Sequence, residues 1–343
     1  MSDFVLAEGF GNLSNGTHTA GTTREILGEQ WSSYALNFAI EDIADGRKWI
    51  IWDGTLREIN LRAPLPSLTS LRFAFRIIRP TGADVHHAFN FYNAAAGSVC
   101  YLRIGTDGKV NFAGTTIAAS STGTIPVDTE THVEVVVSAF STSADATVTF
   151  YLNGVESGVV NNVRTANNAG PLASLGFCTG GGNASRLASG WKYTDFIVHT
   201  GSSPLGDTGV FFIEPDADGT DDDFTPSAGA DNFAMVDEIG PDEDTTYNES
   251  DGTAGHRDSF ATAGISGVTV LSVGTLVRAR KTDTGAATLL LGAVHGASED
   301  QGSAVGLSED YLTYVEFFDD VPGGAGWTPA QVSAAELSYE VGA

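Results

Sequence analysis

The amino-acid sequence predicts an all-β protein made of two domains. The chain has 343 residues, which is more than one ordinary hydrophobic core holds, so two domains are expected. Its 41 glycines and its scarcity of helix formers such as lysine are typical of short strands joined by tight turns. Hydrophobic residues make up 42% of the chain, which is enough for packed interiors.

The distribution of charge predicts where the two domains meet. Residues 1–200 carry 13 basic and 17 acidic side chains, whereas residues 201–343 carry 4 basic and 26 acidic ones. We therefore expect domains at 1–200 and 201–343. The net charge of −26 argues against nucleic acid as a partner, because phosphate contacts need lysine and arginine.

The sequence shows no secretion signal, no membrane-spanning run and only two cysteines. The first ten residues lack the basic and apolar regions of a signal peptide, so synthesis in a cytoplasm is expected. No apolar run is long enough to cross a bilayer, and membrane insertion is not expected. Cys100 and Cys178 are too few for a disulfide framework, and we expect buried thiols, with a bridge between them left open.

Alternation of apolar and polar residues predicts the strands of the first domain. Residues 71–78 place four apolar side chains on one face and Arg72 and Arg76 on the other. Strand–turn–strand patterns surround Asp107-Gly108 and Asn153-Gly154, the strongest short-range hairpin signals. Further strands are expected at 49–52, 88–92, 132–138 and 189–199.

This order of strands resembles a known sandwich family. A strand ending in Tyr151-Leu152-Asn153-Gly154, a return strand, and a late strand containing 195–198 are similar to the concanavalin A-like or laminin-G-like jelly roll. The resemblance covers about residues 4–200 and implies a lectin-like jelly-roll sandwich for the first domain.

The second domain is expected to be a smaller, acidic β-sandwich. Strands are expected at 206–213, 267–280, 288–294 and 311–318, and acidic loops at 214–226 and 242–247. Near the end, residues 327–337 suit a short helix, with Thr328 as N-cap and Pro329 in the first turn.

Short segments of this second half resemble the C-terminal part of tailed-bacteriophage structural proteins. The segments are Gly206-Asp207, 215–219, 224–226, 236–238, 242–247, 280–285 and 326–330, and the opening Glu8-Gly9-Phe10 also resembles such chains. The resemblance implies a non-enzymatic virion structural protein on the particle exterior, on the tail or decorating the capsid. Its implied partners are other virion proteins and further copies of itself, for example in a trimer. Two alternatives are a stand-alone carbohydrate-binding lectin and an enzyme acting on polysaccharide.

A glycan, such as one on a cell surface, is the ligand to consider for the first domain. Aromatic side chains with asparagine can hold sugars, which makes candidates of Trp49, Trp52, Tyr92, Asn93 and Trp191. The competing interpretation is that large aromatics in a sandwich belong to its core.

Metal and catalytic signals are sparse. Oxygen ligands at Asp216, Asp218 and Asp221 could hold a structural Ca²⁺, although the residue at the twelfth position is Ser227 rather than the glutamate of an EF-hand. No other cofactor is expected. The run from Glu130 to Glu134 lacks the central aspartate of lectin-like hydrolases, so the sequence predicts no enzyme.

Overall fold

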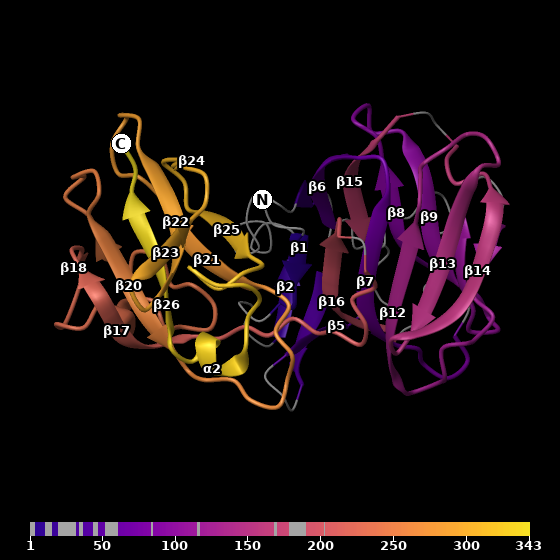
Figure 1. Ribbon diagram of the computed structural model, residues 1–343, viewed down its shortest axis with the longest axis horizontal. Helices are drawn as coiled ribbons and strands as arrows, with labels where there is room; N and C mark the ends of the chain where they lie inside the picture. The colour runs from indigo at the N-terminus through magenta and orange to yellow at the C-terminus, as the bar shows by residue number, and fades with distance from the viewer. Residues whose placement is uncertain are drawn as a thin grey trace. The chain divides into compact units, whose positions relative to one another are not determined.

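The computed structural model describes residues 4–10, 16–19, 32–33, 37–43, 47–51, 61–83, 85–114, 117–167, 170–177, 190–201 and 203–343. The chain divides into two compact units, and the described residues up to Phe212 belong to the larger one while residues 213–343 form the smaller one. Both units consist almost wholly of antiparallel strands, which confirms the predicted all-β class (Figure 1). In the described part of the chain, no helix is long and apolar enough to cross a membrane.

The larger unit is a sandwich of two sheets. Within the described residues, the first sheet has nine strands, in the order β14 (Val155–Val163), β13 (Ala146–Leu152), β12 (Glu130–Val137), β7 (Leu71–Ile78), β16 (Lys192–His199), β5 (Lys48–Ile51), β4 (Asn37–Asp42) and β2 (Gly16–Thr19), with β1 (Phe4–Glu8) also paired to β16. The second sheet has the order β11 (Ile117–Ser120), β10 (Val110–Ala113), β9 (Ser98–Ile104), β8 (His86–Tyr92), β15 (Leu172–Phe177), β6 (Leu61–Leu68) and β3 (Ser32–Ser33).

Aromatic side chains fill the space between the two sheets. Phe73 and Phe75 of β7 are fully buried, and the Phe73 ring lies 4.5 Å from that of Phe89 on the opposite sheet. Phe177 and Phe196 pack against Phe89 from β15 and β16. The predicted alternation of 71–78 is therefore confirmed, because successive residues of a strand point to opposite faces and its aromatic face forms the core.

The smaller unit is built on a sheet of six strands. The order is β17 (Pro215–Asp222), β20 (Arg257–Thr262), β26 (Ala335–Val341), β22 (Thr288–His295) and β23 (Ser298–Gln301), with β24 (Val305–Gly306) also paired to β22. Two short ladders join β18 (Thr225–Pro226) to β19 (Asn248–Glu249) and β21 (Val273–Ala279) to β25 (Leu312–Phe318).

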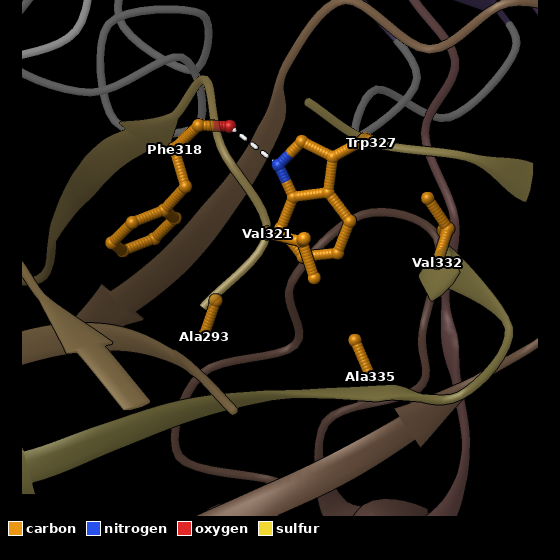
Figure 2. Close-up of a cluster of buried hydrophobic side chains, with 6 residues drawn as sticks. All are labelled: Ala293, Phe318, Val321, Trp327, Val332 and Ala335. Carbon is orange, nitrogen blue, oxygen red and sulfur yellow. Dashed lines mark hydrogen bonds between the residues drawn. The ribbon is translucent and has the colours of Figure 1, made fainter. Parts of the chain in front are cut away.

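A tryptophan organises one of the cores of this unit. Figure 2 shows Trp327 among Val321, Val332 and Ala335, with its indole Nε1 donating a hydrogen bond to the Phe318 carbonyl oxygen at 2.8 Å. A second cluster contains Phe260, Leu289, Leu291 and Tyr339. Apolar burial in these two clusters holds the sheet against the β21–β25 ladder.

The predicted C-terminal helix is confirmed, but only as the single turn α2 (Pro329–Val332) rather than over 327–337, because β26 begins at Ala335. Thr328 accepts a hydrogen bond from the Gln331 amide through its side chain, and the Gln331 side chain accepts one from the Thr328 amide. Pro329 occupies the first turn, where no amide hydrogen is needed. This capping box fixes where the turn begins.

Three of the expected elements differ in the structure. Residues 214–226, expected as an acidic loop, contain β17, because pairing with β20 satisfies its backbone. The strand expected at 267–280 is shortened to β21. Residues 206–213 pair with no strand in the part of the chain that the structure describes. Instead residues 203–212, which we call the strap, bond to side chains of the first sheet.

Candidate active site

The outer face of the nine-stranded sheet carries a cluster of charged and ionisable side chains. Because side chains alternate between the two faces, the same alternation that buries Phe73 and Phe75 turns Arg72 and Arg76 outward. Strand β12 pairs with β7 so that His132 lies opposite Arg76 and Glu134 lies opposite Ala74. On the next strand Tyr151 lies opposite Glu134. One face therefore gathers Arg72, Arg76, Glu130, His132, Glu134 and Tyr151.

Asp195 holds two arginines of this cluster in place. Its carboxylate is fully buried and lies 2.8 Å from Nη1 of Arg47 and 3.2 Å from Nε of Arg76. The Asp195 backbone has a φ of 54°, a left-handed conformation at an irregularity in the pairing of β16 with β7. Such a bulge redirects a side chain, and here it brings the carboxylate onto the outer face. Burial raises the pKa of Asp195, and the two guanidinium groups oppose that shift.

Two glutamates complete the ionic network. Glu130 lies 2.9 Å from Nη1 of Arg76 and 3.3 Å from Nη1 of Arg47. Glu134 is fully buried, and its Oε1 lies 3.6 Å from Nη1 of Arg72. Burial raises the pKa of Glu134, and the nearby Arg72 guanidinium works in the opposite direction. Each of these carboxylates is thus matched to an arginine, as buried charges require.

His132 is suited to accept a proton. The ring is fully buried, and Nε2 lies 3.2 Å from the Thr208 hydroxyl oxygen. Nδ1 has no hydrogen-bond partner among the described residues. Burial and the neighbouring Arg76 guanidinium lower the pKa of His132 to about 4. The imidazole is therefore neutral at physiological pH and has a lone pair to offer.

Tyr151 has the complementary character. Burial raises the pKa of its phenol, and the negative charges of Glu156 and Glu134 raise it further. The phenol therefore keeps its proton at neutral pH and can donate it. Tyr151 is diagonal to His132 across the β12–β13 pair, a separation of about 7 Å that long side chains bridge.

The strap lies against this same cluster. The Leu205 amide donates to both carboxylate oxygens of Glu134, at 3.2 and 3.1 Å. Nη2 of Arg76 donates to Oδ1 of Asp207 at 2.8 Å, and Nε of Arg76 donates to the Thr208 carbonyl at 2.9 Å. Further along, the ring of Phe211 lies 5.7 Å from the Arg47 guanidinium.

Glycines on the sheet and in the strap permit this close approach. A Cβ on Gly9 would lie 2.8 Å from the Val210 carbonyl oxygen, and one on Gly209 would lie 3.0 Å from the Asp195 carboxylate. Gly154, at the β13–β14 turn, has a φ of 74° and leaves 3.1 Å between such a Cβ and the Asp207 amide. At these positions a side chain would collide with the strap or the sheet, so glycine allows the strap to lie this close.

The structure does not bring the predicted glycan ligands together. Trp49 is buried on the same sheet as the charged cluster, in β5. Tyr92 and Asn93 lie at the end of β8 in the opposite sheet, where the Asn93 side chain accepts from the amides of 95 and 97 in its own turn. Trp191 is fully buried and stacks on His86 at 4.7 Å, so it belongs to the core. Trp52 lies outside the described residues.

The three aspartates proposed for Ca²⁺ have separate surroundings. Asp218 accepts a hydrogen bond from the Phe233 amide at 2.6 Å, and Asp221 lies 2.9 Å from Nε of Arg257. Asp216 is exposed on β17. In the regions that the structure describes, no three His, Cys, Asp or Glu side chains are grouped so as to hold a metal ion. Of the two cysteines, Cys100 is a buried free thiol, and Cys178 lies outside the described residues.

Sequence reasoning missed the charged cluster as a site. The run from Glu130 to Glu134 does not match the hydrolase pattern, and the alternation in 71–78 predicts no more than a polar face for Arg72 and Arg76. The available signal was the alternation of ionisable residues in 71–78 and 130–134, which places them on a single face of the sheet if the two strands are neighbours.

Comparisons with known proteins give no match to a family model and none to a curated protein sequence. Among solved structures, the chain is similar to alginate lyase Aly36B, with 15% identity, a TM-score of 0.40, and coverage of 58% of this chain and 97% of that one. It is also similar to a Trypanosoma rangeli sialidase in complex with 2,3-difluorosialic acid, with 10% identity, a TM-score of 0.34, and coverage of 48% and 27%. A third is the endo-β-1,4-glucuronan lyase of the fungus Trichoderma reesei, with 7% identity, a TM-score of 0.38, and coverage of 51% and 91%.

These findings correct two expectations from the sequence. The expected non-enzymatic virion structural protein is contradicted, because the similar structures are of lyases and a sialidase, and none of the three is a phage structural protein. The expectation that the chain is not an enzyme is contradicted by the same structures. The phage resemblance rested on short acidic and glycine-rich segments, and such segments recur wherever strands are joined by turns.

Proposed function

We propose that the larger unit is an enzyme that cleaves an acidic polysaccharide by β-elimination on the outer face of its nine-stranded sheet. The observation that carries this proposal is the neutral, buried His132 lying opposite Arg76 and diagonal to the protonated Tyr151. A base, a cation and an acid on one face are the groups that eliminative cleavage of a uronate requires.

Each group has a defined role in the reaction. His132 removes the proton from the carbon next to the uronate carboxylate, and the released electron pair forms a carbon–carbon double bond. The bond between the adjacent ring carbon and the glycosidic oxygen breaks, and that oxygen takes the proton of Tyr151. The products are a shortened chain and a fragment with an unsaturated uronate at its end, and no water is consumed.

The arginines make it easier to remove the proton from the carbon next to the uronate carboxylate. A uronate carboxylate held by Arg76 and Arg72 has its negative charge offset, so the neighbouring C–H bond becomes more acidic and the charge developing on the carboxylate is stabilised. Asp195 acts as a positioning residue, because it fixes the guanidinium of Arg76 from behind. Charge-assisted, bidentate pairing is the mode in which arginine recognises carboxylates.

Elimination fits this face better than hydrolysis. Glycoside hydrolysis uses two carboxyl groups, one as acid and one as base or nucleophile. Here Glu130 and Asp195 are both engaged by Arg47 and Arg76, and Glu134 faces Arg72. These ion pairs occupy the carboxylate oxygens that a hydrolase would present to the glycosidic oxygen and to a water molecule.

The test is to incubate the full chain with alginate, polyglucuronate and polygalacturonate, and with neutral dextran. The ultraviolet absorbance of the unsaturated uronate is followed. We expect cleavage of at least one polyuronate and none of dextran, with a loss of about 100-fold or more in His132→Ala. The matched control is His256→Ala, which removes a partly exposed histidine of the smaller unit and should cleave like the wild type. Equal rates in both variants, or no cleavage of any polyuronate, would contradict the proposal.

A further inference from the structure

The strap occupies the face on which the proposed reaction takes place. Leu205, Asp207 and Thr208 contact Glu134, Arg76 and His132, and His132 has no exposed surface. The strap belongs to the larger unit itself, so the covering is a property of that unit.

The groups that the strap presents are those of an acidic sugar. The Asp207 carboxylate lies on Nη2 of Arg76 at 2.8 Å, where a uronate carboxylate would bind. The next residue places its hydroxyl 3.2 Å from Nε2 of His132, as a sugar hydroxyl would be placed. A carboxylate and a hydroxyl on neighbouring residues thus reproduce the two polar groups of one sugar unit.

We infer that the strap is an intramolecular competitor of the substrate, with Asp207 holding the place of the substrate carboxylate until an acidic polysaccharide displaces it. This inference rests on the proposed function, because it takes the outer face as the substrate site. It also defines the ligand: the site accepts chains that present a carboxylate to Arg76 and rejects neutral ones, which cannot compete for Arg76.

The contacts between the strap and the sheet can be displaced by an incoming carboxylate. The Asp207 side chain is 51% exposed, whereas that of Arg76 is 14% exposed, so an incoming carboxylate reaches the pair from the Asp207 side. Partly exposed ion pairs contribute little stability, and salt or a competing anion weakens them. Release of the strap frees Nη2 of Arg76 from Asp207 for a substrate carboxylate, while Nε of Arg76 keeps its contact with Asp195 at 3.2 Å.

The first experiment measures the strap directly in the unaltered full chain. Hydrogen–deuterium exchange is followed for residues 203–212 with and without oligomers of alginate or polyglucuronate. The amides of Leu205 and Val210, which donate to Glu134 and Asp195, should exchange faster when the oligomer is bound. Dextran should leave their exchange unchanged.

The second experiment weakens the competitor. Asp207→Asn removes its charge and should bind the oligomers about two- to five-fold more tightly, because a larger fraction of molecules has the face open. The matched control is Asp145→Asn, which removes the same charge from an exposed turn of the same unit and should bind like the wild type.

The outcomes separate this inference from the proposed function. Faster exchange in the strap with tighter binding by Asp207→Asn supports the inference, even if no chain is cleaved, and in that case the proposed reaction alone is wrong. Binding and cleavage with an unchanged strap and unchanged affinity in Asp207→Asn overturn the inference and leave the proposed function standing. No binding by the wild type or by Asp207→Asn overturns both.

Discussion

Replacing His132 by glutamine should make the free energy of unfolding of the larger unit fall less between about pH 8 and about pH 5. The pKa of this histidine falls from 6.5, its ordinary value, to about 4 in the folded chain, because the ring is buried beside Arg76. The folded state therefore binds fewer protons than the unfolded state between these two values, and stability must fall as the pH falls through that window.

The magnitude follows from the two pKa values. At about pH 8 the imidazole is neutral in both states and its titration contributes nothing. At about pH 5 the unfolded chain is protonated at this residue and the folded chain is not, which amounts to a loss of about 2 kcal/mol. Glu134 acts with the opposite sign, because its raised pKa makes the folded state take up protons more readily. That contribution is shared by wild type and variant, so their difference isolates His132.

The assay is the free energy of unfolding of the larger unit from denaturant titrations of the full chain at both pH values. We expect the stability of wild type relative to His132→Gln to decrease by about 2 kcal/mol from pH 8 to pH 5. His256→Gln is the control, and it should follow the wild type because it retains His132. Parallel stability curves for wild type and His132→Gln would refute the burial argument.

Three further substitutions test the packing described above, each by denaturant unfolding of the full chain. Asp195→Ala should cost about 3–5 kcal/mol because it removes the buried carboxylate that lies 2.8 Å from the Arg47 guanidinium, and a cost under about 1 kcal/mol would mean that the ion pair is dispensable. Phe75→Ala should cost about 3–5 kcal/mol by opening a cavity between the sheets, and a near-neutral effect would contradict its full burial. Trp327→Phe should cost the smaller unit about 1–3 kcal/mol, because the buried indole loses both its packing and its hydrogen bond to the Phe318 carbonyl, which keeps the Ser272 hydroxyl as a side-chain donor. An unchanged midpoint would show that neither contribution matters.

Local patterns in the sequence predicted the local structure well. The alternation in residues 71–78 assigned the core face of β7, and Thr328 with Pro329 predicted where the terminal turn begins. Both depend on interactions between residues a few positions apart, which periodicity and capping preferences record.

The strap could not be predicted in the same way. Residues 206–213 have the apolar content of a strand, but their backbone and side-chain partners lie on distant strands rather than in a neighbouring one. Arg76 is 131 residues from Asp207, and Leu205 is 71 residues from Glu134. No periodicity in the segment itself records such partners.

The site was missed for a related reason. The pair between Arg47 and Asp195 spans 148 residues and depends on a bulge at Asp195 that reverses the expected direction of a side chain. By contrast, tryptophans drew attention as sugar ligands by residue type alone, and Trp191 lies in the core. The functional character of this face comes from which strands are neighbours, and a single sequence does not contain that information.

The most direct test of the central claim is a crystal structure of His132→Ala bound to a polyuronate oligosaccharide. The account predicts a sugar carboxylate on Arg76 and the strap displaced from the outer face. It also predicts that the ring carbon bonded to that carboxylate faces position 132. An oligosaccharide bound elsewhere on the chain, with Asp207 still paired to Arg76, would contradict it.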